Sequence, residues 1–310
     1  MRAMRAILVT LAAALPAVAA AQEAMEELTV TAEPVAGSVW MLVGRGGNIA
    51  VSVGEDGIFM IDDQYAPLTP AISEAITRIQ DAPVRFLLNT HWHGDHTGGN
   101  ENFGRAGAVI VAHDNVRERM SKDQFMEFFQ RETPASPPGA LPVVTFSADL
   151  TFHMNGDTVH AFHVPNAHTD GDVMVRFAAA DVVHTGDVYF NGLYPLVDVS
   201  SGGSVRGMIA AIDGLRPHIG TETQVIPGHG PLSDGEALFA YRDMLQDVAD
   251  RIEAMINEGK TLEEVVAAAP TAAYDAQWGG GFLDPPTWVK MLYQDLSRDA
   301  GKASGTAAAR

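Results

Sequence analysis

The feature that most constrains the fold of this chain is a pattern that occurs four times: a short apolar run ends, and histidine or aspartate follows at once. The densest case is segment 89–99, Asn-Thr-His-Trp-His-Gly-Asp-His-Thr-Gly-Gly, directly after the largely apolar run Val84–Leu88. Runs of this length, bounded by turn residues, are typical of buried strands. Because catalytic residues gather in loops at one edge of a rigid sheet, the pattern predicts a fold in which four strand ends meet.

The other three cases lie in the second half of the chain. They are the segments 162–172, 182–190 and 225–230, which contain His168, Asp187 and His229. Imidazole and carboxylate groups suit zinc, iron or manganese, and histidine is the commonest metal ligand. A histidine in a glycine turn is usually structural when it stands alone, but the four cases together indicate a metal centre.

The predicted secondary structure divides the chain into two strand-rich halves, each closed by helices. The expected strands are 29–31, 39–43, 49–53, 58–61, 84–88 and 108–112 in the first half, then 143–146, 150–154, 158–164, 173–177, 181–184 and 224–226 in the second. Helices are expected over 67–80, 115–132 and 204–215, and in most of the chain after 230. Two such halves pack as two sheets with helices outside, which predicts an α/β fold, a four-layer αββα sandwich in a single domain.

The first 21 residues have the features of a secretory signal. Arg2 and Arg5 precede an apolar run over 6–15, and small residues of the Ala-x-Ala kind lead to position 21. The apolar run is too short to cross a membrane. We therefore expect export, to the periplasm, with a mature domain over 22–300 and a flexible tail over 301–310.

Composition excludes several classes of function. The chain has no cysteine, so disulfides, zinc–thiolate sites and cysteine nucleophiles are excluded even in an oxidising compartment. With 39 acidic against 20 basic residues the formal net charge is −19, a field that repels nucleic acid and anionic membranes. The expected partner is a small-molecule substrate, with no nucleic acid and no membrane.

Taken together, these residues resemble the metallo-β-lactamase superfamily. The resemblance extends from about Val39 to His229 and rests on the motif His-x-His-x-Asp-His over 91–96 and on the three later positions. It implies two zinc ions per chain, with Asp187 bridging them. The ligand sets that it implies are His91, His93 and His168 for one metal and Asp95, His96 and His229 for the other.

The resemblance also implies a reaction, metal-assisted hydrolysis. Water made nucleophilic between two metals would attack a carbonyl or phosphoryl centre, and Asp95 would orient it and carry its proton. We therefore predict an exported dizinc hydrolase, with β-lactam hydrolysis as the leading activity. The predicted substrate contacts are Arg45, in a flap-like loop over 44–48, and Asn191 and Tyr194, in a second loop over 191–204.

Two departures from the drug-cleaving branch leave alternatives open. That branch has cysteine where this chain has Asp187, and a lysine a few residues later that is absent here. A carboxylate at this position is more similar to thioesterases of the glyoxalase type and to phosphodiesterases, so a thioesterase, lactonase or phosphodiesterase is the alternative hydrolase. A mononuclear iron sulfur dioxygenase and a non-catalytic metal-binding protein are further alternatives, although open coordination positions serve no storage purpose.

Three smaller expectations concern the surroundings of the centre. Asp62 or Asp63 could accept a hydrogen bond from a metal-binding imidazole. His184 is expected to be a core histidine because its neighbours are apolar. The Met- and Phe-rich segment 120–129 is expected to be helical and to pack in the core, with a lid over the site as the alternative.

Overall fold

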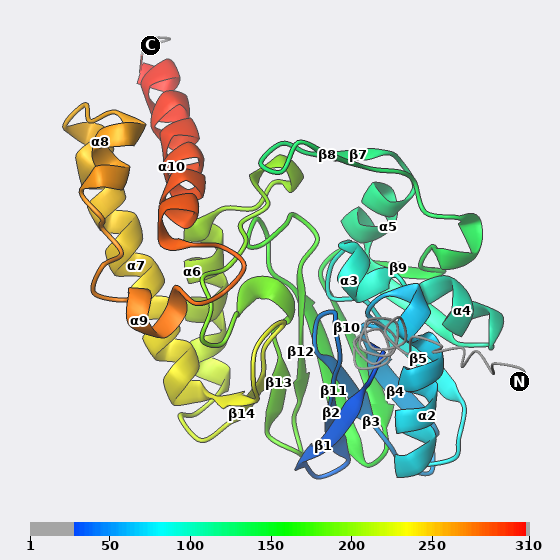
Figure 1. The fold of residues 1–310 in the computed structure, drawn as a ribbon. Coiled ribbons are helices and arrows are strands. Elements are labelled where there is room, and N and C mark those ends of the chain that lie inside the picture. Colours follow the sequence, from blue (N-terminus) through cyan, green and yellow to red (C-terminus); the bar gives the residue numbers. More distant parts are fainter. Residues whose placement is uncertain (1–27, 308–310) are drawn as a thin grey trace, which may run out of the picture.

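Two β-sheets stacked face to face form the centre of the protein, with helices on both outer sides (Figure 1). The computed structural model describes residues 28–307, with side chains up to residue 298. The first sheet has the order β1-β2-β3-β4-β5-β6-β9, and the second has the order β10 to β15. The strands of the first sheet are β1 (Thr31–Ala36), β2 (Val39–Val43), β3 (Ile49–Ser52), β4 (Ile58–Ile61), β5 (Val84–Leu88), β6 (Val109–His113) and β9 (Val144–Phe146).

The second sheet is antiparallel except where β13 and β14 run parallel. Its strands are β10 (Asp149–Met154), β11 (Asp157–His163), β12 (Val173–Phe177), β13 (Val182–His184), β14 (Gln224–Ile226) and β15 (Ser233–Asp234). Alternation along β11 turns Val159 and Ala161 toward the first sheet and leaves His160 on the other face. Apolar side chains of both sheets thus form one core between them, which includes Phe59 and Phe177.

Helices cover the outer face of each sheet, as Figure 1 shows. On the first sheet lie α2 (Thr69–Ile79) and α4 (Asn100–Arg105), and on the second lie α6 (Val205–Leu215), α7 (Gly235–Asn257) and α10 (Pro285–Ala307). The shorter helices are α3 (Gly94–Thr97), α5 (Asp114–Met120), α8 (Leu262–Ala267) and α9 (Asp275–Trp278). The predicted αββα sandwich is confirmed.

The helix predicted over 115–132 is wrong. Helix α5 ends at Met120, and a separate hairpin follows, made of β7 (Gln124–Met126) and β8 (Arg131–Thr133). Its base is closed because the Asp123 carboxylate accepts a hydrogen bond from the Ala135 amide. The aromatic residues of the segment are spaced as on a helical face, but Phe125 lies in β7 and Phe128 and Phe129 lie in the turn between the two strands.

The predicted chain ends are only partly covered by the structure. Helix α10 continues to Ala307, and so covers most of the range of the expected tail; no proline after its first turn stops the helix. The predicted signal over 1–21 and the end of the tail lie outside the described residues. No helix in the described part of the chain is both long and apolar enough to cross a membrane.

Candidate metal centre

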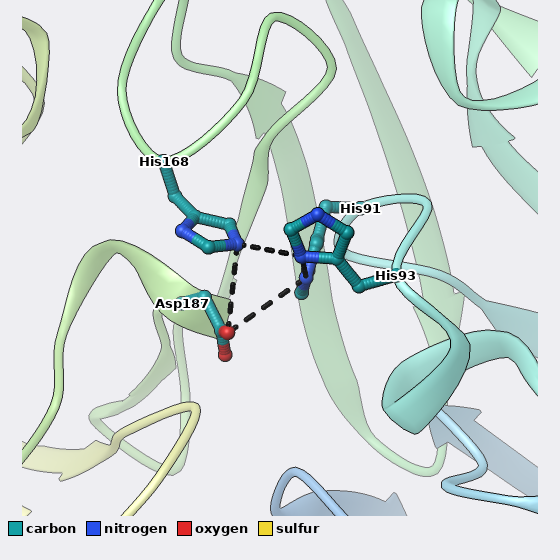
Figure 2. Close-up of side chains that lie close together, drawn as sticks. All are labelled: His91, His93, His168 and Asp187. Carbon is teal, nitrogen blue, oxygen red and sulfur yellow. Dashed lines mark hydrogen bonds and ion pairs between the residues drawn. The ribbon is translucent and has the colours of Figure 1, made fainter. Parts of the chain in front are cut away.

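The four segments singled out in the sequence meet at one edge of the sandwich. The first follows β5, the second joins β11 to β12, the third follows β13 and the fourth follows β14. Figure 2 shows side chains from three of these loops, His91 and His93, His168, and Asp187, pointing toward one another. The neighbouring strands β13 and β14 are parallel, which brings their carboxyl ends, and therefore Asp187 and His229, together.

Three imidazoles form the first half of the centre. His93 Nδ1 lies 3.1 Å from His91 Nε2 and 2.9 Å from His168 Nε2. The Asp187 Oδ2 atom lies 3.8 Å from His91 Nε2 and 3.6 Å from His168 Nε2. All four residues are buried, and their ligand atoms lie within 4.8 Å of one another.

Asp95, His96 and His229 form the second half, next to the first. His229 Nε2 lies 3.3 Å from Asp95 Oδ2, and His96 Nε2 lies 3.7 Å from the same oxygen. The Asp187 carboxylate reaches this half too, with Oδ1 3.0 Å from His96 Nε2 and Oδ2 3.4 Å from His229 Nε2. The structure thus brings all seven predicted ligands together, and Asp187 stands between the two sets.

The outer ring nitrogens of these histidines face acceptors. His93 Nε2 lies 3.0 Å from Asp198 Oδ2, and His168 Nδ1 lies 2.8 Å from the Leu196 carbonyl oxygen. His96 Nδ1 lies 2.7 Å from Asp62 Oδ2. An imidazole that donates at its outer nitrogen turns the lone pair of its inner nitrogen toward the centre, which is the tautomer that binds metal.

Asp62 is the residue that organises this shell. Its carboxylate also accepts hydrogen bonds from the Thr90 amide and hydroxyl, each at 2.7 Å, and its backbone has a φ of 61°. Left-handed backbone is uncommon for aspartate and is found at sites where the surroundings enforce it. Of the two candidates, Asp62 is therefore the partner of His96, whereas Asp63 accepts from the Gly99 amide.

Burial and charge set the protonation states at the centre. Burial, aided by the neighbouring histidines, lowers the pKa of His91 well below its usual value, and burial lowers that of His168 to about 4. Burial disfavours protonation of His229, but the Asp187 and Asp95 carboxylates raise its pKa to about 9. Burial likewise opposes ionisation of Asp187, yet the surrounding histidines hold its pKa well below the usual range. His91 and His168 are thus neutral imidazoles, the form that binds metal, beside an ionised carboxylate.

Two buried atoms show that the residues fit metal ions. His96 Nε2 and Asp187 Oδ1 face each other at 3.0 Å but make no hydrogen bond, and buried polar atoms left without hydrogen bonds cost about 1–3 kcal/mol each. Both are donor atoms for divalent cations. Glycine keeps the space beside them open, since a Cβ at Gly47 would lie 2.0 Å from His96 Cε1 and one at Gly228 would lie 2.1 Å from Asp187 Oδ1.

The centre opens into a cleft of about 520 Å³, and one of the three predicted substrate contacts lines it. Arg45 lines the cleft, as expected. Tyr194 does not: its hydroxyl donates to Asp275 Oδ1 at 2.8 Å and its ring stacks on Trp288 with centroids 4.1 Å apart. That prediction is wrong because Leu193 and Leu196, on either side of Tyr194, are the residues that line the cleft.

Asn191 is not among the cleft-lining residues either. Its side-chain amide donates to the Pro231 carbonyl at 3.0 Å, and its backbone amide donates to the His229 carbonyl at 2.9 Å. It therefore braces the loop that carries His229. His184 is a buried core histidine, as predicted, with Nε2 3.0 Å from the Asn48 carbonyl oxygen.

Sequence reasoning missed two contributors to the site. Asp198, the partner of His93, is 105 positions away and belongs to no spacing motif; only its place in the loop after Asn191 could have suggested it. The hairpin supplies Met126, Phe129 and Arg131 to the cleft wall, which supports the lid alternative over core packing. In the sequence, the proline-rich turn after segment 120–129 was the one sign that this segment could cover the site.

A protein-family model described as "Metallo-beta-lactamase superfamily" matches residues 32–229, well over half of the chain. The chain belongs to this superfamily. The match contains all seven ligand positions, and the superfamily consists largely of metal-dependent hydrolases.

Individual relatives are distant. The α subunit of 2,4-dinitroanisole O-demethylase from Nocardioides sp. (strain JS1661) is 24% identical over 173 residues, which are 54% of this chain and 48% of that protein. Hydroxyacylglutathione hydrolase from Methylococcus capsulatus is 27% identical over 204 residues, 63% of this chain and 70% of that protein. The chain thus spans about half the length of the demethylase subunit.

Among solved structures, a metallo-β-lactamase from Pontibacter korlensis is similar in fold. It superposes with a TM-score of 0.56 and 20% sequence identity, covering 71% of this chain and all of that chain. The remaining part of this metallo-β-lactamase superfamily member therefore extends beyond the shared fold.

For this superfamily member we expect Asp187→Ala to remove more than half of the bound metal, because one carboxylate reaches both ligand sets. Metal per chain would be measured by mass spectrometry after purification without chelators, with two ions expected for the wild type. Asp149→Ala, on a carboxylate 62% exposed and outside the centre, is the control. Full metal content in the Asp187 variant would contradict a bridging position.

The shell around His96 gives a second prediction. In Asp62→Asn an amide oxygen can still accept from Thr90, but the atom facing His96 Nδ1 becomes a donor. We expect metal affinity to fall about 10–100-fold, as is common when such outer partners are lost. Competition with a chromogenic chelator measures this, and Asp56→Asn at an exposed turn is the control. Unchanged metal affinity would mean that Asp62 holds Thr90 in place but has no influence on His96 as a ligand.

Proposed function

We propose that this protein is an exported dinuclear zinc hydrolase that cleaves a carbonyl bond in a small amphipathic anion, with a β-lactam as the leading substrate. The observation that carries the proposal is the Asp187 carboxylate, which stands between two ligand sets at the floor of an apolar cleft. Two zinc ions held there would supply Lewis acidity and a nucleophile at neutral pH. Two adjoining sets support a dinuclear hydrolase more than a single-iron enzyme.

Asp95 is suited to handle the proton of the reaction. Its carboxylate is 24% exposed at the cleft floor, whereas the histidines next to it are more deeply buried or held by other partners. Burial opposes its ionisation, but His96 and His229 keep its pKa well below the usual range. An ionised carboxylate at this place can take a proton from attacking water and return it to the leaving nitrogen or sulfur.

The rim of the cleft indicates what kind of substrate fits. Tyr65, Phe129 and Phe282 all line it and are 42%, 42% and 62% exposed. Large apolar side chains gathered in the open around one cleft mark a binding surface. Arg45 and Arg131 stand at the same rim and would attract an anionic group. β-Lactams combine an apolar side chain, a carboxylate and a strained amide.

Thioester hydrolysis is the second candidate, on the same centre. A hydroxyacylglutathione hydrolase is among the relatives, and its substrate name describes an anionic thioester. The reaction differs only in the leaving atom, sulfur rather than nitrogen. Export remains a prediction from residues 1–21, which lie outside the described structure.

A substrate panel tests the proposal. The zinc-loaded protein would be assayed with a cephalosporin, an acyl thioester, a lactone and a phosphodiester, each against a His91→Ala control. We expect turnover of the cephalosporin above the control, because the amide carbonyl would meet both the centre and the arginine rim. Turnover of the thioester alone would replace the leading substrate by the second candidate. No turnover of any member would contradict a hydrolase.

Arg131→Gln tests the rim. No ion pair of the Arg131 guanidinium occurs among the described residues, so the variant removes a charge without leaving a carboxylate unpaired. For a carboxylate-bearing substrate we expect KM to rise about three- to tenfold with kcat unchanged, since an exposed charge contributes uniform binding. Arg78→Gln, on the far helix α2, is the matched control. An equal change for a neutral ester would show that the effect is not electrostatic.

A further inference from the structure

A second cavity lies between the outer face of the second sheet and helix α6. Its volume is about 500 Å³, and it shares no lining residue with the metal cleft. This volume lies within the range of small-molecule sites. One wall comes from β11 and β12, and the other from α6 and the turn after it.

An arginine in this cavity has a buried nitrogen without a partner. The Nε atom of Arg176, on β12, makes no hydrogen bond, and no ion pair of this guanidinium occurs among the described residues. Other partly buried arginines among the described residues are paired; Arg119, for example, holds Asp170 through two contacts of 2.6 Å. An unpaired cation in a chain with about twice as many acidic as basic residues therefore needs an explanation.

The neighbours of Arg176 do not supply the missing acceptor. In the sheet register Arg176 stands directly opposite His160, an imidazole rather than a carboxylate. The nearby Asp149 carboxylate lies 3.4 Å from His160 Nε2 and so pairs with this imidazole. His218 reaches the cavity from the other wall, and no acidic residue lines it. The cavity thus contains the imidazoles of His160, His163 and His218 but no carboxylate that could pair with Arg176.

The rest of the cavity is apolar. Phe162 stacks against His160 with centroids 5.4 Å apart, and Val164 and Pro165 continue this wall. On the helix side, Gly214 lies one turn from Ala210, and no heavy atom lies within 4 Å of the place where its Cβ would be. An apolar slot therefore leads to the guanidinium.

We propose that this cavity binds a small carboxylate with an apolar body, the carboxylate at Arg176 and the body between Phe162 and α6. A carboxylate supplies the acceptor that the guanidinium lacks, in the paired geometry that arginine favours. The apolar body removes the surface of the slot from water. The site is separate from the metal centre and does not depend on the proposed hydrolase activity.

Decanoate is the probe, titrated calorimetrically into the zinc-loaded full chain. We expect one decanoate at the cavity, binding at least tenfold weaker in Arg176→Gln and retained in Arg176→Lys. Gly214→Leu should abolish binding at this site, because leucine fills the slot and is a good helix former. Arg78→Gln and Ala254→Leu, both on exposed helix faces, are the matched controls and should bind as the wild type. Decan-1-ol should bind wild type and Arg176→Gln equally weakly.

Three results would overturn the proposal. One is an affinity for decanoate that neither Arg176→Gln nor Gly214→Leu changes. If decanoate then inhibits hydrolysis competitively, its binding site is the metal cleft. Another is equal affinity for decanoate and decan-1-ol, which would show that no anion site exists. The third is binding of phosphatidylglycerol vesicles without binding of free decanoate, which would make this face a lipid surface. Circular dichroism of both variants separates loss of binding from loss of fold.

Discussion

The position of the Asp187 carboxylate between two sets of nitrogen ligands is the constraint on which the rest of the structure depends. Five histidines and two aspartates crowd into a space where neighbouring ring nitrogens approach to 2.9–3.1 Å. Lone pairs at such distances repel one another unless cations or protons lie between them. The burial that makes His91 and His168 neutral also opposes ionisation of Asp187, and the histidines around this carboxylate keep it ionised. Metal ions satisfy both demands at once.

Holding these groups together requires a rigid frame, and the sandwich supplies it. The ligand loops begin where β5, β13 and β14 end, and these strands are buried between apolar layers. A second ring of contacts then sets each imidazole, through Asp62, Asp198 and the Leu196 carbonyl. The left-handed backbone of Asp62 is an unfavourable conformation, and the hydrogen bonds from Thr90 offset its free energy.

The strands and the ligand sets could be predicted from the sequence because both leave a local pattern. Apolar runs gave β2, β4, β5, β12 and β14 their observed bounds, and glycine-rich turns marked the ligands. What failed depends on contacts distant in sequence. The aromatic residues of 120–129 have helical spacing, yet Asp123 and Ala135 close a hairpin instead. The inward side chain of Tyr194 is decided by Trp288 and Asp275, which no local pattern near the loop reveals.

The cleft wall is built partly from a segment outside the range that the family model matches. Phe282 lies beyond the matched range 32–229, in the segment that leads into α10. The hairpin tip is fixed to that helix by the ion pair of Glu127 with Arg298, and to the His93 shell by the hydrogen bond from the Glu127 amide to Ser200. These two contacts connect the hairpin with its neighbours beside the cleft, whose wall it helps to form. The C-terminal segment therefore contributes to the cleft wall, next to the metal-binding residues that the family match contains.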